Sequence, residues 1–330
     1  MNASAGDGAA VTAGAGWLSR VAERLVATGY GVGWSVVKAV PLSVADRAFT
    51  AAADTAFRRR GPSTVQLARN LKRVLGDTAT PASLSAVTKA ALRSYARYWL
   101  ETFRLPSMDH DAVVATMLAN LPGVEHVRAA LDAGRGIVMP LPHSGNWDVA
   151  GLAMARTFGG ISTVAERLKP ASLFDEFVAY RESLGFEVLP LTGGPNPSTV
   201  LRQRLREGKI VCLVADRDLS ASGIAVDFFG EPTRMPAGPA MLAAVTGADL
   251  CPTHLYYLDG GWAGDISAPL TLRGTRLRDQ VADGTQQMAD FFAAGIARHP
   301  ADWHMVQPLW PADLPLRPDR APATAAAASP

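Results

Sequence analysis

The sequence predicts an α/β fold: a mainly parallel central sheet flanked by helices, with a helical portion at the N-terminus. Three observations lead to this prediction. After residue 121, short apolar runs typical of buried strands alternate with longer segments of helical periodicity. Proline and glycine separate these segments, as they do at the ends of strands and helices. Before residue 110, apolar residues recur at three- and four-residue spacing, which is typical of helices.

The individual elements follow from the same patterns. The expected strands are 136–141, 161–166, 186–191, 210–215, 249–258 and 262–267. The expected helices between and after them are 146–157, 171–184, 198–207, 236–246 and 279–298. Strands joined through helices pair in parallel, so we expect the first two strands to be neighbours. No helix separates the last two strands, which favours an antiparallel pair.

We expect a single α/β domain over 17–310, because 330 residues of which 48% are hydrophobic can form one large core. Its helical part is 17–109, and its sheet-containing core is 121–310. The Ala/Gly-rich residues 1–16 and the Pro/Ala-rich residues 311–330 are expected to be disordered.

Charge and cysteine content argue against several classes of protein. A net charge of +2 is too small for a nucleic-acid-binding protein. Cys212 and Cys251 lie in separate apolar runs, which favours buried thiols in a cytosolic protein over a disulfide or a metal site. The first residues lack the positive charge of a signal peptide, and no apolar run reaches the roughly 20 residues that span a bilayer.

The helical part is nonetheless suited to a membrane-facing position. The uncharged stretch 25–37 follows Trp17 and could form a helix at the membrane interface, or pack on the protein's own core. Basic residues outnumber acidic ones further along, at Arg58, Arg59, Arg60, Arg69, Lys72, Arg73, Lys89, Arg93, Arg97 and Arg104. A solvated helical face explains such a run, and so does attraction to an anionic membrane, at about 1 kcal/mol per basic residue.

The stretch around His143 carries the clearest chemical signal. The apolar run 137–141 predicts a strand that breaks at Pro142, and Asn146 can cap a following helix. His143 then lies in the loop and Asp148 in the first helical turn, so that the two side chains can meet at the carboxyl end of a strand. Such a pair can activate a hydroxyl group, because the imidazole accepts its proton while the carboxylate orients the imidazole.

A purely structural explanation of the same residues stays open, because Asp148 can simply favour the positive end of a helix dipole. His254 and Asp259 repeat the spacing of the pair, but in a strand an odd separation places two side chains on opposite faces. The sequence contains no phosphate loop, no Gly-x-Ser-x-Gly nucleophile elbow, no dinucleotide fingerprint and no cluster with metal-ligand spacing. We therefore expect neither a metal nor a redox cofactor.

Several blocks in order resemble the HxxxxD glycerolipid acyltransferases, in the branch of the bacterial lipid A acyltransferases. The segment His143-Ser-Gly-Asn-Trp-Asp148 matches the motif of that branch. The resemblance extends over most of the chain through the blocks ARYWLETFRLP (96–106), VAERLKP (164–170), LVADRDL (213–219) and VDFFGEPTRMPAGPAMLAAVTGA (226–248). The VAERLKP and DRDL blocks are most similar to the phosphatidylinositol mannoside acyltransferases of actinobacteria.

This resemblance implies a function. Enzymes of that group move a palmitoyl group from palmitoyl-CoA to the 6-hydroxyl of a mannose in a phosphatidylinositol mannoside, on the cytoplasmic face of the inner membrane. It implies that His143 is the general base, that Asp148 orients it, and that the hydroxyl attacks the thioester without an acyl-enzyme. Backbone N–H groups of 144–146 are candidates for stabilising the oxyanion. The implied partners are acyl-CoA as co-substrate, a mannosylated lipid acceptor and an anionic membrane surface, without nucleic acid.

Glu166 and Arg181 are candidates for substrate binding, each with a structural alternative. Glu166 ends the second strand and could bind sugar hydroxyls, or pair with Arg167 or Lys169. Arg181 lies in the last turn of a helix, where it could bind substrate or complement the helix dipole.

Three more candidates lie later in the chain. Arg217 follows the fourth strand and could hold a phosphate group, or pair with Asp216 or Asp218. Glu231 and Arg234 precede a helix whose N-terminus could bind an anion.

Other functions remain compatible with the sequence. The same fold and His/Asp pair could acylate another glycolipid or a lysophospholipid, and acyl carrier protein could be the donor, because both donors present a phosphopantetheine thioester. A non-catalytic lipid-binding protein is the alternative from another class, against which the presence of both His143 and Asp148 argues. An acyl chain needs a long apolar groove, but groove and core residues look alike in sequence.

Overall fold

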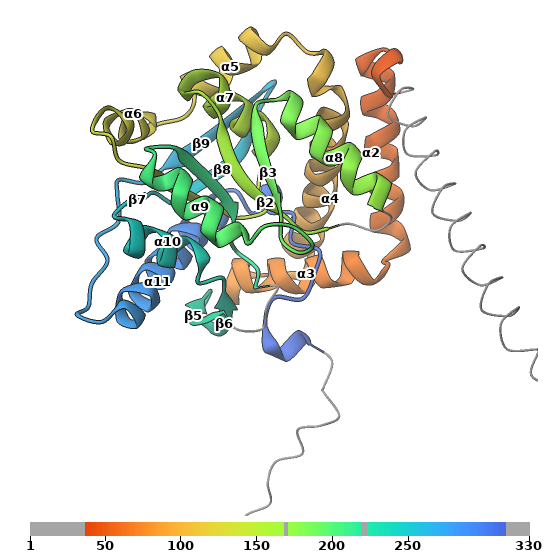
Figure 1. Cartoon of the computed structure of the whole chain (residues 1–330). Coiled ribbons are helices and arrows are strands. Elements are labelled where there is room, and N and C mark those ends of the chain that lie inside the picture. The colour runs from red at the N-terminus through yellow and green to blue at the C-terminus, as the bar shows by residue number, and fades with distance from the viewer. Residues whose placement is uncertain (1–36, 168–170, 219–222, 315–330) are drawn as a thin grey trace, which may run out of the picture.

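The computed structural model describes residues 37–167, 171–218 and 223–314, and shows a central sheet with helices on both faces (Figure 1). The expected disordered N-terminus, nearly all of the expected interfacial helix, and residues 315–330 of the expected tail lie outside the described residues. None of the helices in the described ranges combines the length and the apolar character that a membrane span requires.

The central sheet has five parallel strands in the order β3-β2-β4-β1-β7. They are β1 (Ile137–Leu141), β2 (Ile161–Ala165), β3 (Phe186–Pro190), β4 (Ile210–Val214) and β7 (Asp249–Leu250). β1 is buried along its whole length and pairs with β4 on one side and β7 on the other. The predicted α/β fold with a mainly parallel sheet is therefore confirmed.

Two expectations about the strands are wrong. The first two strands are not neighbours, because β4 lies between β1 and β2; alternation of strands and helices indicates parallel pairing but leaves the strand order open. The expected strand 249–258 is divided into β7 and β8 (Thr253–Leu258) by Cys251 and Pro252. Proline lacks the N–H group that a strand inside a sheet must donate.

Two antiparallel hairpins accompany the central sheet. β8 pairs with β9 (Gly261–Ile266), as the close spacing of the last two expected strands predicts. The other hairpin, formed by β5 (Ile224–Phe228) and β6 (Glu231–Met235), was not predicted. β6 contains Glu, Pro and Arg, and so lacks the apolar run by which the other strands are recognised, and Asp227 interrupts the apolar residues of β5.

Five helices of the α/β core lie close to the expected ranges, and a sixth, α6, was not predicted. They are α6 (Val124–Asp132), which precedes β1, and α7 (Trp147–Phe158), α8 (Ala171–Ser183), α9 (Pro197–Arg206), α10 (Gly238–Thr246) and α11 (Leu277–Arg298). Ile137, Met139 and Leu141 of β1 share a core with α7 and α8, whereas Val138 shares a core with α9 and α10. Both faces of the sheet are thereby buried, as parallel sheets require.

The helical part predicted before residue 110 is also present. It contains α2 (Leu42–Arg59), α3 (Pro62–Leu75) and α4 (Pro81–Arg104), and is followed by α5 (His110–Ala119). A second core is formed where α2, α3 and α4 pack against α11 and against Trp303 and Trp310 near the end of the described chain.

Residues 311–314, in the expected disordered tail, lie beside α3. Pro311–Asp313 forms a short 3-10 helix. The Asp313 carboxylate accepts a hydrogen bond of 2.7 Å from Arg73, because the end of the chain returns to α3.

The basic face of the helical part is smaller than the sequence suggests. Partners within the protein hold Arg73, Lys89, Arg93, Arg97 and Arg104. Arg104 donates to backbone C=O groups, and of the other nine residues Arg58, Arg59, Arg60, Arg69 and Lys72 form no ion pair within 4.0 Å with a described acidic residue.

Candidate active site

An open cleft lies at the carboxyl ends of the strands, the edge at which open α/β sheets bind ligands. It encloses about 1160 Å³, including space open to solvent. His143 follows β1, Glu166 follows β2 and Arg217 follows β4. These three residues line the cleft together with Arg181 of α8. Much of the remaining wall is aromatic and consists of Tyr95, Tyr98, Trp99, Trp147, Phe174 and Phe177.

The loop that carries His143 is fixed where α7 begins. Asn146 caps this helix as predicted, its side-chain oxygen accepting a backbone N–H of the first turn at 3.0 Å. The Asn146 amide also donates to the buried Glu101 carboxylate at 2.7 Å. Gly145 has a φ of 57°, and a Cβ at this position would lie 2.7 Å from the backbone of Leu255. Only glycine fits here, because both the conformation and the space exclude a side chain.

His143 forms its side-chain hydrogen bond with Asp216, not with Asp148. Nδ1 of His143 lies 2.6 Å from Oδ1 of Asp216. The backbone N–H of His143 donates to Oδ2 of the same carboxylate at 3.0 Å. Asp216 follows β4, and since β4 is the direct neighbour of β1, the two strand ends bring the residues together. The hydrogen bond expected between His143 and Asp148 is therefore replaced by one that the strand order creates.

The carboxylate of Asp216 is ionised although it is fully buried. Burial raises its pKa, but attraction to the charge that His143 carries when protonated, together with hydrogen bonds from His143 and Trp303, outweighs this effect, so the pKa of Asp216 lies below its ordinary value. Because an ionised carboxylate can only accept hydrogen bonds, Nδ1 of His143 carries a proton. Nε2 of a neutral imidazole then has the free lone pair. The His143 side chain lines the cleft and is 37% exposed, so it can reach a substrate.

Asp148 is also fully buried, and it holds other residues of the cleft. Its Oδ1 accepts from Nε of Arg181 at 2.9 Å, and its Oδ2 accepts from the hydroxyl of Tyr98 at 3.0 Å. Burial, and then the negative charge of Asp148, raise the pKa of Tyr98 well above its ordinary value, so the phenol remains a donor. Asp148 thus fixes two side chains in the cleft wall.

Glu231 and Arg234 do not lie in this cleft. Both belong to the β5–β6 hairpin, outside the residues that line it. Glu231 accepts from Nε of Arg73 at 2.8 Å, and Nη1 of Arg234 donates to the C=O of Gly223 at 2.6 Å. Their proximity in sequence to the N-terminus of α10 therefore does not bring them to the site.

Two of the backbone N–H groups expected to stabilise an oxyanion have other acceptors. The N–H of Ser144 donates to the C=O of Pro142 at 2.7 Å, and the N–H of Gly145 donates to the C=O of Asp302 at 3.0 Å. These hydrogen bonds hold the loop in place but remove both donors from the cleft.

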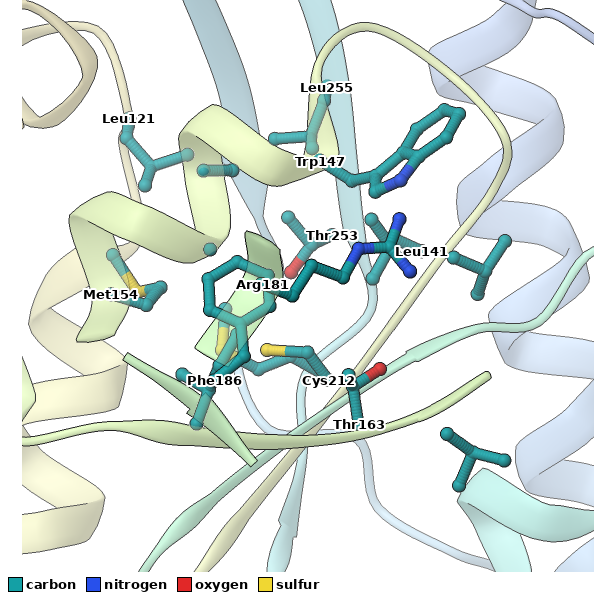
Figure 2. A pocket seen from close by; sticks show the side chains of 16 residues that line it. Leu121, Leu141, Trp147, Met154, Thr163, Arg181, Phe186, Cys212, Thr253 and Leu255 are labelled. Atoms are coloured by element: carbon teal, nitrogen blue, oxygen red, sulfur yellow. The ribbon is translucent and has the colours of Figure 1, made fainter. Parts of the chain in front are cut away.

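An apolar pocket of about 660 Å³, including space open to solvent, adjoins the cleft (Figure 2). Trp147, Val164, Arg181 and Val214 line both cavities. The side chains that line this pocket but not the cleft include Leu121, Met139, Met154, Phe186, Cys212 and Leu255. Figure 2 shows the long side chain of Arg181 reaching across the pocket below Trp147. Burial raises the pKa of the Cys212 thiol to about 12, which keeps it uncharged among these apolar groups.

Sequence reasoning missed three residues of the site. Asp216 was considered only as a partner for Arg217, although it directly follows an expected strand and this position is a usable signal. Tyr98 lies within a helix and His304 in an irregular segment, where no pattern marks them. His304 is buried in the cleft wall, and burial lowers its pKa to about 3, so it is neutral at pH 7.

The remaining candidates have structural roles or none at the site. His254 is buried in β8 and Asp259 is exposed in the turn after it, so they do not form a second pair. Both cysteines are free thiols. Within the described ranges, no three His, Cys, Asp or Glu side chains are grouped so that they could hold a metal ion.

Comparison with known proteins identifies the family of this chain. The sequence model of a family described as bacterial lipid A biosynthesis acyltransferase matches residues 16–312. A phosphatidylinositol mannoside acyltransferase of Mycolicibacterium smegmatis is 51% identical over 288 residues, which cover 87% of this chain and 91% of the relative. Proteins of the same name from two strains of Mycobacterium tuberculosis are 50% identical over 86% of this chain and 88% of theirs. The chain therefore belongs to the family of bacterial lipid A biosynthesis acyltransferases and is an enzyme that transfers acyl groups.

Proposed function

We propose that this enzyme transfers a long-chain acyl group, such as palmitoyl, from acyl-CoA to the 6-hydroxyl of a mannose in a phosphatidylinositol mannoside. The observation that carries the proposal is the His143–Asp216 pair in a cleft that continues into an apolar pocket. The mycobacterial relatives, named phosphatidylinositol mannoside acyltransferases, support the choice of acceptor.

In the proposed reaction, Nε2 of His143 takes the proton of the attacking hydroxyl. The hydroxyl oxygen bonds to the thioester carbonyl carbon, and the carbonyl oxygen becomes an oxyanion. Collapse of this intermediate forms the ester and breaks the carbon–sulfur bond, and the thiol of coenzyme A leaves with the proton from the imidazolium. The charge of Asp216 stabilises the imidazolium while it exists. No acyl-enzyme is formed, because His143 acts on the acceptor directly.

The two cavities suit the two parts of such a substrate pair. The apolar pocket offers Leu, Met and Phe side chains to an acyl chain, and burying each CH₂ group contributes about 0.8 kcal/mol. The cleft offers Glu166 to sugar hydroxyls, and Arg181 and Arg217 to anionic groups of either substrate. The side chains that both cavities share, Trp147, Val164, Arg181 and Val214, would surround the thioester.

The acceptor is tested by competition. Purified enzyme receives labelled palmitoyl-CoA and an equimolar mixture of monomannosylated and dimannosylated phosphatidylinositol, a lipid A precursor and a lysophospholipid. Mass spectrometry of the products identifies the labelled lipid and the acylated hydroxyl. A parallel reaction with palmitoyl-loaded acyl carrier protein compares the donors. Each reaction is repeated with the His143→Ala variant. The matched control is His126→Ala, because His126 is a half-buried histidine of α6.

Label on the mannose 6-hydroxyl, lost in His143→Ala and kept in His126→Ala, is the expected result. Label on the lipid A precursor or the lysophospholipid alone would overturn the proposed acceptor and leave an acyltransferase of other specificity. Faster transfer from acyl carrier protein would overturn acyl-CoA as the donor. Binding of all lipids without transfer would contradict catalysis as a whole.

The enzyme is further proposed to work as a peripheral protein at the cytoplasmic face of the inner membrane. Arg58, Arg59 and Arg60 support this, because they lie together at the end of α2 without close acidic partners among the described residues. Their joint replacement by serine should weaken co-sedimentation with anionic liposomes, and so should high salt. Replacing Arg273, Arg276 and Arg278 removes the same charge at the start of α11 and is the control. Equal losses in both variants would contradict a specific basic surface.

A further inference from the structure

A short segment near the end of the described chain lies against the loop that carries His143. Residues 302–304 form an isolated antiparallel bridge with this loop, between Ser144 and Trp303. The C=O of Asp302 accepts the N–H of Gly145 at 3.0 Å, and the N–H of His304 donates to the C=O of His143 at 2.7 Å. The position of the loop is therefore set by a segment about 160 residues further along the chain.

The side chain of Trp303 continues this contact to the carboxylate of Asp216. Its indole Nε1 donates to Oδ2 of Asp216 at 2.9 Å. The indole is fully buried, and it packs edge-on against Phe228 and Trp310 at centroid distances of 6.1 and 6.3 Å. The buried ring is enclosed by other aromatic rings while its N–H points at Oδ2 of Asp216.

The two oxygens of Asp216 thereby have separate partners. Oδ2 accepts two N–H groups, from the Trp303 indole and from the backbone of His143. Oδ1 is left for Nδ1 of His143 at 2.6 Å. Without the indole donor, one lone pair of a fully buried carboxylate would lack a partner, and the carboxylate could relieve this by rotating away from the imidazole.

We infer that Trp303 is a positioning residue for acyl transfer, which acts through Asp216 to hold the His143 imidazole with Nε2 directed at the acceptor hydroxyl. The inference rests on the proposed use of His143 as the base. Trp303 contributes no atom to the cleft wall. Its effect on the reaction therefore passes entirely through the Asp216 carboxylate and the loop.

Trp310 provides a matched control. It is also fully buried, belongs to the same core and donates its indole N–H, in this case to the C=O of Phe228 at 3.3 Å. It has no contact with Asp216. Trp303→Phe and Trp310→Phe both remove an indole N–H and part of a core side chain, so a loss that comes only from packing should be similar in the two variants.

Kinetics give the first test. We expect Trp303→Phe to lower kcat by about 10-fold to 100-fold, the range for loss of a hydrogen bond to a charged group, with KM for acyl-CoA changed little. Trp310→Phe keeps an aromatic ring beside Trp303 and leaves the N–H donor of Trp303 in place, so it should retain kcat. In an Asp216→Asn background, Trp303→Phe should lower kcat by less than about threefold further, because two residues that act through one contact are not additive. Full additivity would overturn the inference.

Nuclear magnetic resonance gives a test that does not depend on turnover. In enzyme labelled with ¹⁵N-histidine, the Nδ1–H proton of His143 should resonate far downfield, as for an imidazole bonded to a carboxylate, and His143→Ala identifies it by its disappearance. Trp303→Phe should shift or broaden this signal, and Trp310→Phe should leave it in place. An unchanged signal in Trp303→Phe would overturn the inference.

A third variant covers the case in which Trp303→Phe does not fold. Incorporating 3-benzothienylalanine at position 303 replaces only the indole N–H with sulfur and keeps the shape of the ring, so the same shift of the signal is expected. If wild-type enzyme acylates no acceptor, the proposed function fails. The resonance would still show whether Trp303 positions His143.

Discussion

Nδ1 of His143 lies 2.6 Å from Oδ1 of Asp216, although 73 residues separate the two in the chain. The first follows β1 and the second follows β4, and these strands are neighbours in the sheet. Asp148, the acid of the sequence motif, instead holds Arg181 and Tyr98. The site therefore contains two buried carboxylates with separate tasks: Asp216 orients the imidazole, and Asp148 fixes the cleft wall.

Asp216→Asn should lower kcat by about 10²-fold to 10⁴-fold with little change in KM, since an amide carries no charge for the imidazolium and can donate to Nδ1, which favours the wrong tautomer. Steady-state kinetics with saturating acyl-CoA measure this change. Asp218→Asn is the control, because Asp218 lies two residues further on and accepts the N–H of Gly223. Activity of Asp216→Asn within about threefold of wild type would contradict the assignment.

Asp148→Ala should mainly reduce stability. The substitution leaves the Arg181 guanidinium without its carboxylate partner. The Arg181 side chain is only 19% exposed, and breaking such a largely buried pair costs about 3 to 5 kcal/mol of folding free energy. Urea unfolding measures the free energy. The control is Asp279→Ala, which breaks a solvent-exposed pair with Arg276 and should have a small effect. Equal losses in the two variants would show that Asp148 is not the anchor of the cleft wall.

Gly151→Ala should shift the preference of the enzyme toward shorter acyl chains. Gly151 lines the apolar pocket, and a Cβ at this position would overlap the ring of Phe186. The ring or the helix must then move into the pocket and shorten it. Transfer rates from acyl-CoA donors of increasing chain length measure the preference. An unchanged optimum chain length would indicate that the acyl chain binds elsewhere. Gly238→Ala, at the start of α10 where no atom lies near the added Cβ, is the control.

His254→Phe should reduce the loss of stability in acid. Burial, followed by the charges of His299 and Arg298, lowers the pKa of His254 from 6.5 to about 3. Below pH 6.5, His254 is therefore protonated in the unfolded chain, whereas in the folded protein it stays neutral down to about pH 3. The free energy of unfolding therefore keeps the full contribution of the neutral ring above pH 6.5. As the pH falls from 6.5 toward 3, it decreases by up to about 1.4 kcal/mol per pH unit.

Urea unfolding at pH 7.5, 6 and 5 checks this prediction. The free energy of unfolding should fall less steeply with pH in His254→Phe than in wild type. His304, whose pKa is also lowered to about 3, should preserve part of the slope in the variant. The two ring nitrogens of His254 have no hydrogen-bond partner among the described residues, so the variant should lose little stability at pH 7.5. Identical slopes would contradict the linkage.

How far the sequence predicts this structure depends on whether the information is local. β1, Asn146 as the cap and α7 were predicted because an apolar run, a cap residue and a helical period are local patterns. The position of β4 between β1 and β2 was not predicted, because strand order depends on packing across the whole chain. The partner of His143 depends on that order, and so Asp148 was predicted where Asp216 is found.

The same distinction explains the other candidates. Glu166 and Arg217 line the cleft, because residues that follow parallel strands share one edge of the sheet. Glu231 and Arg234 do not line the cleft, because they lie in the unexpected β5–β6 hairpin. There Glu231 contacts Arg73, and Arg234 contacts Gly223. Trp303 could not have been predicted, because an irregular segment has no period that indicates what its side chains contact.

The central claim is that His143 is the base that activates the acceptor hydroxyl. The most direct measurement is the rate of acyl transfer from saturating acyl-CoA to phosphatidylinositol mannoside by His143→Ala, beside wild type and His126→Ala. We expect kcat of His143→Ala to fall by about 10²-fold or more while acyl-CoA binding persists, and His126→Ala to match wild type. Transfer by His143→Ala at the wild-type rate would contradict the account.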